Sequence, residues 1–124
     1  MSEQRDPVIR VMAMPKDTSF GNAVFGGWLM SQMDIAAGLV AARRAEGRIV
    51  TVATDAMQFH LPVKVGDVIS VYCEVVSVGR TSMKISVEAT RSQRYSSKEA
   101  KVTEAVFSFV AVDDEGRPRA VPEE

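Results

Sequence analysis

The chain has 124 residues, of which 46% are hydrophobic, and its 15 basic and 16 acidic residues give a formal net charge of -1. This length suits one hydrophobic core, so we expect a single domain over residues 1–124, and the balanced charge provides no broad basic surface for nucleic acid or an anionic membrane. The polar start of the chain lacks a signal-peptide core, and the lone Cys73 excludes an internal disulfide and a multi-thiolate zinc site. These features favour a cytoplasmic protein with Cys73 as a buried structural thiol.

The N-terminal part of the chain is expected to contain one short strand. Residues 1–7 are polar and are predicted to form a flexible arm, and the apolar run 8–14 is typical of a strand that Pro15 ends. Residues 16–22 combine Asp, Thr, Ser, Gly and Asn, which is the composition of an ordered loop.

One long helix is predicted after this loop. Residues 28–42 are rich in Leu, Met and Ala and contain no proline, and the helix is expected to stop at Gly47 after two arginines. Its single acidic residue, Asp34, has only small or apolar residues three and four positions away. An acid in such surroundings is a candidate general base, and the alternative is a solvent-facing position on an amphipathic helix.

Four strands are predicted in the second half of the chain, at residues 49–59, 68–78, 82–90 and 102–112. Residues 83, 85, 87 and 89 should point inward in the third of these strands, and the last strand is apolar on both faces. One helix covers only one face of an antiparallel sheet, so we expect the sheet to curl strongly or a second subunit to cover it. Residues 117–124, with two prolines, are expected to form a tail.

The glycine pair Gly26 and Gly27 stands at the start of the predicted helix. Free backbone N–H groups and the helix dipole at this place can stabilise a polarised carbonyl oxygen, and a tight turn is the alternative explanation. Asp34 comes seven residues after Gly27, which is about two turns or roughly 10 Å along the helix axis. One helix would not easily present both groups to one carbon atom. Antiparallel helices of two subunits would bring Gly27 of one near Asp34 of the other.

Several segments resemble the YciA-like acyl-CoA thioesterases of the hotdog fold. The matching segments follow in the same order from residue 11 to residue 122, and they are residues 12–15, 17–18, 25–34, 47–52, 62–67 and 102–107. The block Phe-Gly-Gly-Trp followed by Ser-Gln-Met-Asp is the most specific. The resemblance implies an α+β hotdog fold, in which a curved antiparallel sheet of about five strands wraps one long central helix. It also implies hydrolysis of acyl-CoA to a free acid and CoA without a metal or other cofactor, by homodimers that assemble into hexamers as trimers of dimers.

The resemblance further implies roles for individual residues. Asp34 would activate the hydrolytic water, and Gly27 would donate its backbone N–H to the thioester carbonyl. The turn at residues 80–82 resembles the family's contact with the pantetheine and phosphate portion of CoA. The complete expected substrate-binding set is Gly26, Asn22, Ser19, Thr51, Met57, Phe59, Arg80, Thr81 and Ser82.

Two departures from the family pattern keep an alternative open. Ser19 stands where the family usually has Asn, and Ala23 stands where it usually has Asp. These substitutions support a hotdog module that binds acyl-CoA without hydrolysing it. A hotdog dehydratase is less favoured, because that chemistry needs a histidine near the helix start and His60, the only histidine, lies elsewhere.

Basic residues also gather on the central turns and the polar loop before the last strand. They are Arg80, Lys84, Arg91, Arg94 and Lys98. Such side chains can bind phosphate groups, although most of them in any protein are solvated surface.

Overall fold

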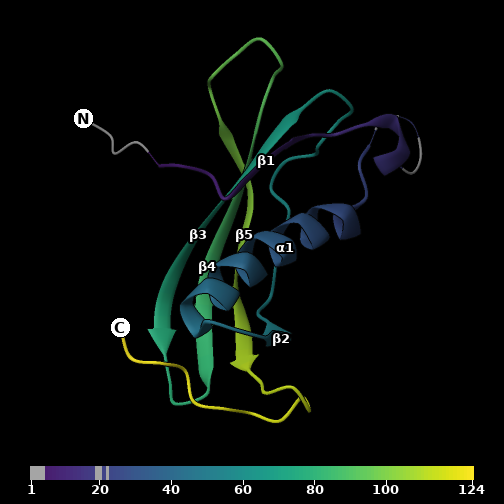
Figure 1. Ribbon diagram of the computed structural model, residues 1–124. Helices are drawn as coiled ribbons and strands as arrows, with labels where there is room; N and C mark the ends of the chain where they lie inside the picture. The colour runs from purple at the N-terminus through teal and green to yellow at the C-terminus, as the bar shows by residue number, and fades with distance from the viewer. Residues whose placement is uncertain (1–4, 19–20, 22) are drawn as a thin grey trace.

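The computed structural model describes residues 5–18, 21 and 23–124, and within these residues it contains one α-helix and one five-stranded sheet. The helix α1 spans Gly26–Ala45, and a single 3-10 turn, η1, spans Pro15–Asp17. The strands are β1 (Ile9–Met12), β2 (Ile49–Thr54), β3 (Val68–Val78), β4 (Ser82–Ser92) and β5 (Ala100–Ala111). All neighbouring strands pair antiparallel in the order β1-β3-β4-β5-β2 (Figure 1).

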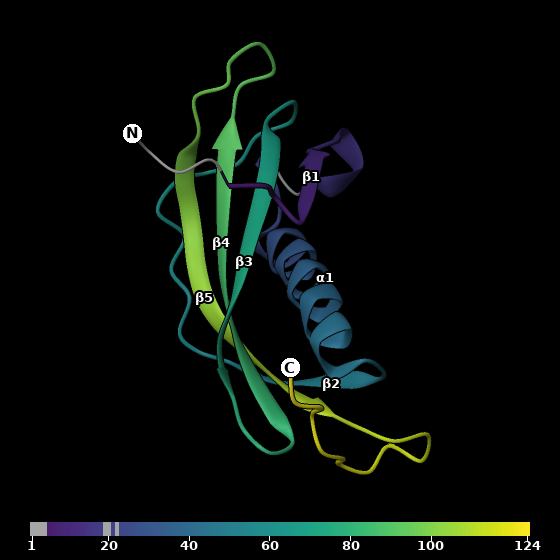
Figure 2. The same ribbon diagram turned by 60° about the vertical axis from the view of Figure 1, so that its left-hand side comes forward.

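The long strands β3, β4 and β5 bend around α1, which lies along one face of the sheet (Figure 2). The pairing is irregular at two places, where Val76 of β3 has no partner in β4 and Val102 of β5 has no partner in β4. Such bulges bend a strand and increase its twist. The predicted α+β architecture, with one helix wrapped by a curved antiparallel sheet, is confirmed. No helix in the described part of the chain is long and apolar enough to cross a membrane.

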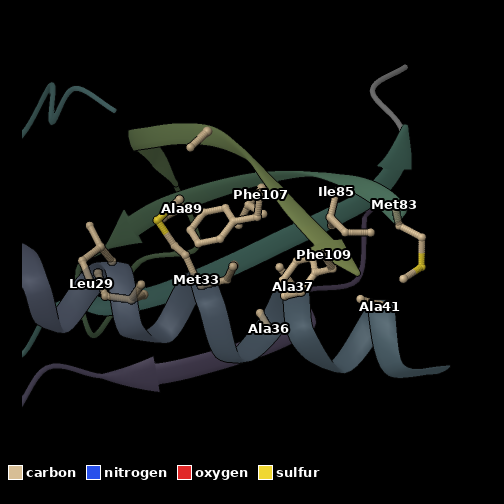
Figure 3. Packing of buried hydrophobic residues seen from close by; sticks show 14 of the residues in the cluster. Leu29, Met33, Ala36, Ala37, Ala41, Met83, Ile85, Ala89, Phe107 and Phe109 are labelled. Carbon is tan, nitrogen blue, oxygen red and sulfur yellow. The ribbon is translucent and has the colours of Figure 1, made fainter. Parts of the chain in front are cut away.

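The hydrophobic core fills the space between α1 and the sheet (Figure 3). The helix contributes Leu29 and Met33 together with several fully buried alanines, and β5 contributes the stacked rings of Phe107 and Phe109, whose centroids are 6.5 Å apart. Alanines on the buried side of a helix let its axis approach the sheet closely. The predicted inward set of β4 is confirmed, because Met83, Ile85, Val87 and Ala89 are all buried.

Strand β2 is shorter than predicted. It ends at Thr54, whereas the alternating pattern predicted a strand to residue 59. The pairing of β2 with β5 shifts between Thr51 and Ala53, and Asp55 then caps the backbone by accepting the N–H of Val106 at 2.8 Å. Beyond Asp55, two hydrogen bonds connect the segment to β5. The N–H of His60 donates to the carbonyl of Val102, and the hydroxyl of Thr103 donates to the carbonyl of Gln58 at 2.6 Å. The bulge and the cap therefore lead the chain out of the sheet.

The helix also ends one residue earlier than expected. Glu46, with φ 54°, takes the left-handed conformation at the helix end, one residue before the predicted glycine stop at Gly47. A Cβ on Gly47 would lie 2.6 Å from the guanidinium of Arg119. A side chain at position 47 would therefore require the end of the Arg119 side chain to shift, whereas the backbone conformation of Gly47 does not itself require glycine.

Both ends of the described chain lie against the sheet. Arg5, within the predicted arm 1–7, donates to Glu88 at 3.0 Å and its guanidinium lies 4.0 Å from the centre of the Tyr72 ring. In the predicted tail 117–124, the N–H of Val121 donates to the carbonyl of Arg80 at 2.8 Å. The C-terminal segment therefore packs beside the turn between β3 and β4, as Figure 1 shows.

Candidate active site

Asp34 is held by the edge strand of the sheet. Its carboxylate Oδ1 accepts a 2.8 Å hydrogen bond from the hydroxyl of Thr51 in β2. Thr51 pairs with Phe109 in β5, and directly opposite residues of an antiparallel pair point to the same face. Phe109 is buried beneath the helix, so the Thr51 side chain also faces α1. The structure thus brings together two predicted site residues that are separated by 17 positions.

The helix N-terminus carries the glycine pair. Phe25 is the N-cap, and it has an extended backbone and no side-chain capping bond. The first N–H groups of a helix have no partner within the helix, so those of the first turn point outward. A Cβ added to Gly27 would meet none of the described heavy atoms within 4 Å, whereas a Cβ on Gly26 would lie 3.4 Å from the ring of Phe59. Gly27 is therefore open to a ligand, and Gly26 accommodates an aromatic neighbour.

An apolar groove of about 230 Å³ adjoins this helix start. Its lining residues are Val24, Phe25, Gly26, Leu29, Phe59, Leu61, Pro62, Val63 and Val102. Phe59 is 45% exposed, while Met57, another predicted residue, packs against the core. A mostly apolar groove beside free backbone donors suits an acyl or pantetheine chain whose carbonyl reaches the helix start. The sequence prediction missed Val24, Leu61 and Val63, although the apolar run around Pro62 was visible.

The predicted residues Arg80, Thr81 and Ser82 form the turn between β3 and β4. The carbonyl of Thr81 accepts the N–H of Ala111, and Ser82 pairs with Val110. Within one subunit this turn lies at the opposite end of the sheet from the start of α1, where Gly26 is the first residue (Figure 1). The structure does not bring it together with the glycine pair in one chain. Ser19 and Asn22 lie outside the described residues.

Cys73 and His60 are two further residues whose side chains could take part in chemistry. Partial burial raises the pKa of the Cys73 thiol to about 11, so this side chain is protonated at neutral pH and is a poor nucleophile. His60 is exposed and follows the irregular segment after β2. Neither residue joins the pair formed by Asp34 and Thr51.

Comparison with known proteins identifies the family. The profile of the thioesterase superfamily matches residues 21–98. A protein of Zymomonas mobilis described as an uncharacterised acyl-CoA thioester hydrolase is 53% identical over 117 residues, which cover 94% of this chain and 78% of that protein. The acyl-CoA thioester hydrolase YciA of Escherichia coli is 48% identical over 129 residues, which cover 98% of this chain and 94% of that protein.

A solved structure agrees with these relatives over the whole fold. The hexameric thioesterase of Yersinia pestis superposes with a TM-score of 0.91 at 44% identity, and the match covers 99% of this chain and 100% of that chain. The chain therefore belongs to the thioesterase superfamily and, within it, to the YciA-like acyl-CoA thioester hydrolases.

Proposed function

We propose that this protein hydrolyses acyl-CoA thioesters to a free carboxylic acid and CoA. The observation that carries the proposal is the anchored carboxylate of Asp34, which the Thr51 hydroxyl holds at 2.8 Å on the same helix that begins at Gly26 and Gly27 beside an apolar groove. The relatives from Zymomonas mobilis and Escherichia coli carry the name of the same activity.

Asp34 acts as the general base in this proposal. Thr51 occupies Oδ1 of the carboxylate, so Oδ2 accepts a proton from a water molecule while the water oxygen attacks the thioester carbon. General-base assistance of this kind contributes about 10²- to 10⁴-fold to a rate. The C–S bond then breaks, and the CoA sulfur leaves with the proton that Asp34 had taken.

Gly27 stabilises the charge that develops on the carbonyl oxygen. Its backbone N–H lies in the first helical turn, where the helix dipole adds to the hydrogen bond. Loss of a donor to such an oxyanion typically costs about 3 kcal/mol of transition-state stabilisation. The apolar groove orients the substrate, and Phe59 and Met57 limit the space for the acyl chain.

The site is shared between two subunits. Gly27 and Asp34 are separated by roughly two helical turns, and β2, which holds Asp34 through Thr51, is an unpaired edge of the sheet in one chain. Exposed apolar side chains on α1 and β2, among them Ile35, Leu39 and Val52, give a second copy a surface to pack on. The relative from Yersinia pestis is hexameric, and we expect homodimers of this chain to assemble in the same way as trimers of dimers.

The proposal needs no metal or organic cofactor, and CoA takes part only as a portion of the substrate and as a product. Dialysis against EDTA should therefore leave the activity unchanged. We also expect the protein to lie in the cytoplasm, where its single thiol, Cys73, would stay reduced. Subcellular fractionation of the native host tests that location.

A thiol-release assay over acyl-CoAs of graded chain length tests the activity. The wild type should release free CoA, and Asp34→Asn should be slower by about 10²-fold or more because the amide cannot accept a proton. Asp114→Asn, an exposed position beyond β5, is the matched control and should retain full activity. Equal rates for wild type and Asp34→Asn would remove Asp34 from the mechanism. Binding of acyl-CoA without any turnover by the wild type would instead support the non-catalytic module that Ser19 and Ala23 suggest.

A complementation experiment tests the shared site. Asp34→Asn and Gly27→Ala chains, each expected to be about 10²-fold slower alone, are co-expressed with different affinity tags, and the mixed dimers are purified. If each site takes Gly27 from one subunit and Asp34 from the other, a mixed dimer contains one intact site and recovers about half of the wild-type activity per dimer. A site built within one subunit would leave the mixed dimers as slow as their parents.

A further inference from the structure

Asp17 is a buried acidic side chain that takes no direct part in the proposed reaction. It is 7% exposed, and in the described part of the chain it is the one charged residue that is buried. Burial of a carboxylate is costly unless hydrogen bonds and opposite charges compensate for the lost water. The contacts of Asp17 therefore indicate its role.

The carboxylate of Asp17 closes the turn η1. Its Oδ2 accepts the N–H of Met14 at 2.9 Å, and the N–H of Asp17 donates in return to the carbonyl of Met14 at 2.9 Å. Its Oδ1 accepts a hydrogen bond from Nζ of Lys16 at 3.2 Å. The bond from Met14 lowers the pKa of Asp17 from its ordinary value of 3.8, burial opposes this effect, and Lys16 adds to it. At neutral pH the ionised carboxylate thus holds both ends of the turn.

The turn is fixed to the sheet on one side and to α1 on the other. Before the turn, the fully buried Ala13 donates its N–H to the carbonyl of Asp67 at 2.9 Å and accepts the N–H of Gly66 at 2.9 Å. After the turn, the carbonyl of Asp17 accepts the N–H of Phe25 at 3.1 Å. The position of Phe25 therefore depends on the shape of the turn that Asp17 closes.

Phe25 is the residue from which α1 starts. It is the N-cap and has no side-chain capping bond. Its carbonyl accepts the N–H of Trp28 at 3.1 Å, so the ladder of the helix begins there and the N–H of Gly27 has no partner within the helix. The direction of that free N–H follows from the direction in which the chain enters the helix. A displacement of Phe25 would consequently turn the Gly27 donor.

We propose that Asp17 is a positioning residue for thioester hydrolysis, because its carboxylate holds the turn that fixes Phe25 and thereby aims the Gly27 N–H at the carbonyl oxygen. The inference rests on the proposed function, since it takes Gly27 as the donor to that oxygen. Asp17 acts through Gly27 and makes no contact with the substrate. A displacement of about 1 Å at a catalytic group can cost about 10²-fold in rate.

Substitutions of Asp17 test this role in a thiol-release assay. Asp17→Ala removes the acceptor for the N–H of Met14, so kcat should fall about 10²-fold while KM changes little. Asp17→Asn keeps an oxygen that can accept this N–H and should recover most of kcat. If the alanine variant does not fold, Asp17→Ser replaces it, because a hydroxyl closes such turns more weakly than a carboxylate and a smaller loss of kcat is expected. Full kcat in Asp17→Ala would overturn the inference.

Asp113→Ala is the matched control, because Asp113 closes another turn in the same manner. Its Oδ1 accepts the N–H groups of Glu115 and Arg117, both at 2.9 Å. This turn follows β5, whose last residue, Ala111, donates its N–H to the carbonyl of Thr81, so it lies at the end of the sheet away from the start of α1. The control should retain wild-type kcat. An equal fall of kcat in Asp113→Ala and Asp17→Ala would overturn the inference, since any opened turn would then have the same effect.

The double variant Asp17→Ala/Gly27→Ala separates positioning from a general loss of structure. If Asp17 acts through Gly27, the double variant should be about as slow as Gly27→Ala alone, because the methyl group already blocks the donor. Two independent losses of about 10²-fold would instead multiply to about 10⁴-fold, and this result would overturn the inference while the wild type remains an active hydrolase. A wild type that hydrolyses no acyl-CoA would overturn the proposed function and, with it, the role of Asp17.

Discussion

Thr51 in the edge strand β2 donates a 2.8 Å hydrogen bond to Asp34 in the middle of α1. This contact links the helix to the outermost strand of the sheet, on the side where β2 has no further strand in one chain. The carboxylate is therefore held in a fixed orientation at the margin of the subunit. A second subunit can reach it there, while the buried side of the helix remains closed by the core.

Thr51→Val tests whether this hydrogen bond positions the base. Valine keeps the shape of threonine but cannot donate, so the carboxylate loses its anchor and kcat should fall roughly 10-fold to 100-fold, in line with the cost of a misplaced catalytic group. KM should change little, because the substrate contacts are preserved. Thr51→Ser, which restores the hydroxyl, should recover most of kcat. A valine variant with wild-type kcat would show that Thr51 is not a positioning residue.

Substitution of the two glycines should separate catalysis from packing. Gly27→Ala introduces a methyl group into open space of the subunit, so thermal stability should be retained while kcat/KM falls about 10²-fold, because the methyl group blocks approach to the N–H. Gly26→Ala places its methyl group 3.4 Å from the ring of Phe59. That variant should shift the acyl chain-length preference, since Phe59 lines the groove. Identical chain-length profiles for the two variants would contradict this division of roles.

The regular part of the fold was predictable from the sequence, because local pattern determines it. Alternation in β4 places Met83 and Ile85 beneath the helix as predicted. By the same alternation Thr90, which follows the inward-pointing Ala89, should point outward, yet it is only 3% exposed. The carboxylate of Glu99 in the following loop covers its hydroxyl, and a contact between a strand and the folded-back loop leaves no periodic signal in the sequence.

The candidate site was predictable only in part, for a similar reason. The glycine pair and Asp34 stand out in one helix, but the partner of Asp34 depends on the register of β2 against β5. That register contains a shift after Thr51, which alternation alone does not indicate. Lys64 and Lys98 likewise line one polar cavity of about 480 Å³, and only the folded sheet shows that these two residues lie together.

The end of α1 gives a prediction for stability. Glu46 has φ 54°, a left-handed conformation that is unfavourable for a residue with a Cβ. Glu46→Gly should raise the free energy of unfolding by about 0.5 to 1 kcal/mol. Gly47→Ala should lower it, because the new Cβ would displace the guanidinium of Arg119, whose Nε–H donates to the carbonyl of Val112 at 2.9 Å. Urea unfolding measures whether the two substitutions change the free energy of unfolding in opposite directions. Destabilisation by Glu46→Gly would contradict the left-handed C-cap at this residue.

Cys73 should react slowly with thiol reagents. Burial raises the pKa of its thiol to about 11, so at pH 8 almost none of it is thiolate, and the burial also limits access. In the folded protein its labelling with DTNB should be slower by at least 10-fold than in 6 M urea, where the thiol regains an ordinary pKa. Labelling at the same rate in both conditions would place Cys73 outside the protected core.

Glu99 should stabilise the loop before β5 in a pH-dependent way. Partial burial opposes its ionisation, but hydrogen bonds from Thr90 and Tyr72 and the charges of Arg10 and Arg5 prevail and lower the pKa of Glu99 below its ordinary value of 4.5. A lowered pKa means that the folded state favours the ionised form, so its contribution is complete above the ordinary pKa and disappears as the pH falls through the lower folded-state value.

Glu99→Gln should therefore reduce the free energy of unfolding by about 1 kcal/mol at pH 7, a modest value for lost charge-assisted hydrogen bonds because the side chain is 28% exposed. The difference between wild type and variant should shrink as the pH falls from the ordinary pKa of 4.5 through the lowered folded-state pKa of Glu99, because the wild-type carboxyl becomes protonated over that range. Urea unfolding between pH 3 and pH 7 measures this difference. Glu74→Gln, an exposed position on β3, is the control and should leave the stability unchanged across the range. A pH-independent difference for Glu99→Gln would mean that the carboxylate charge does not hold the loop.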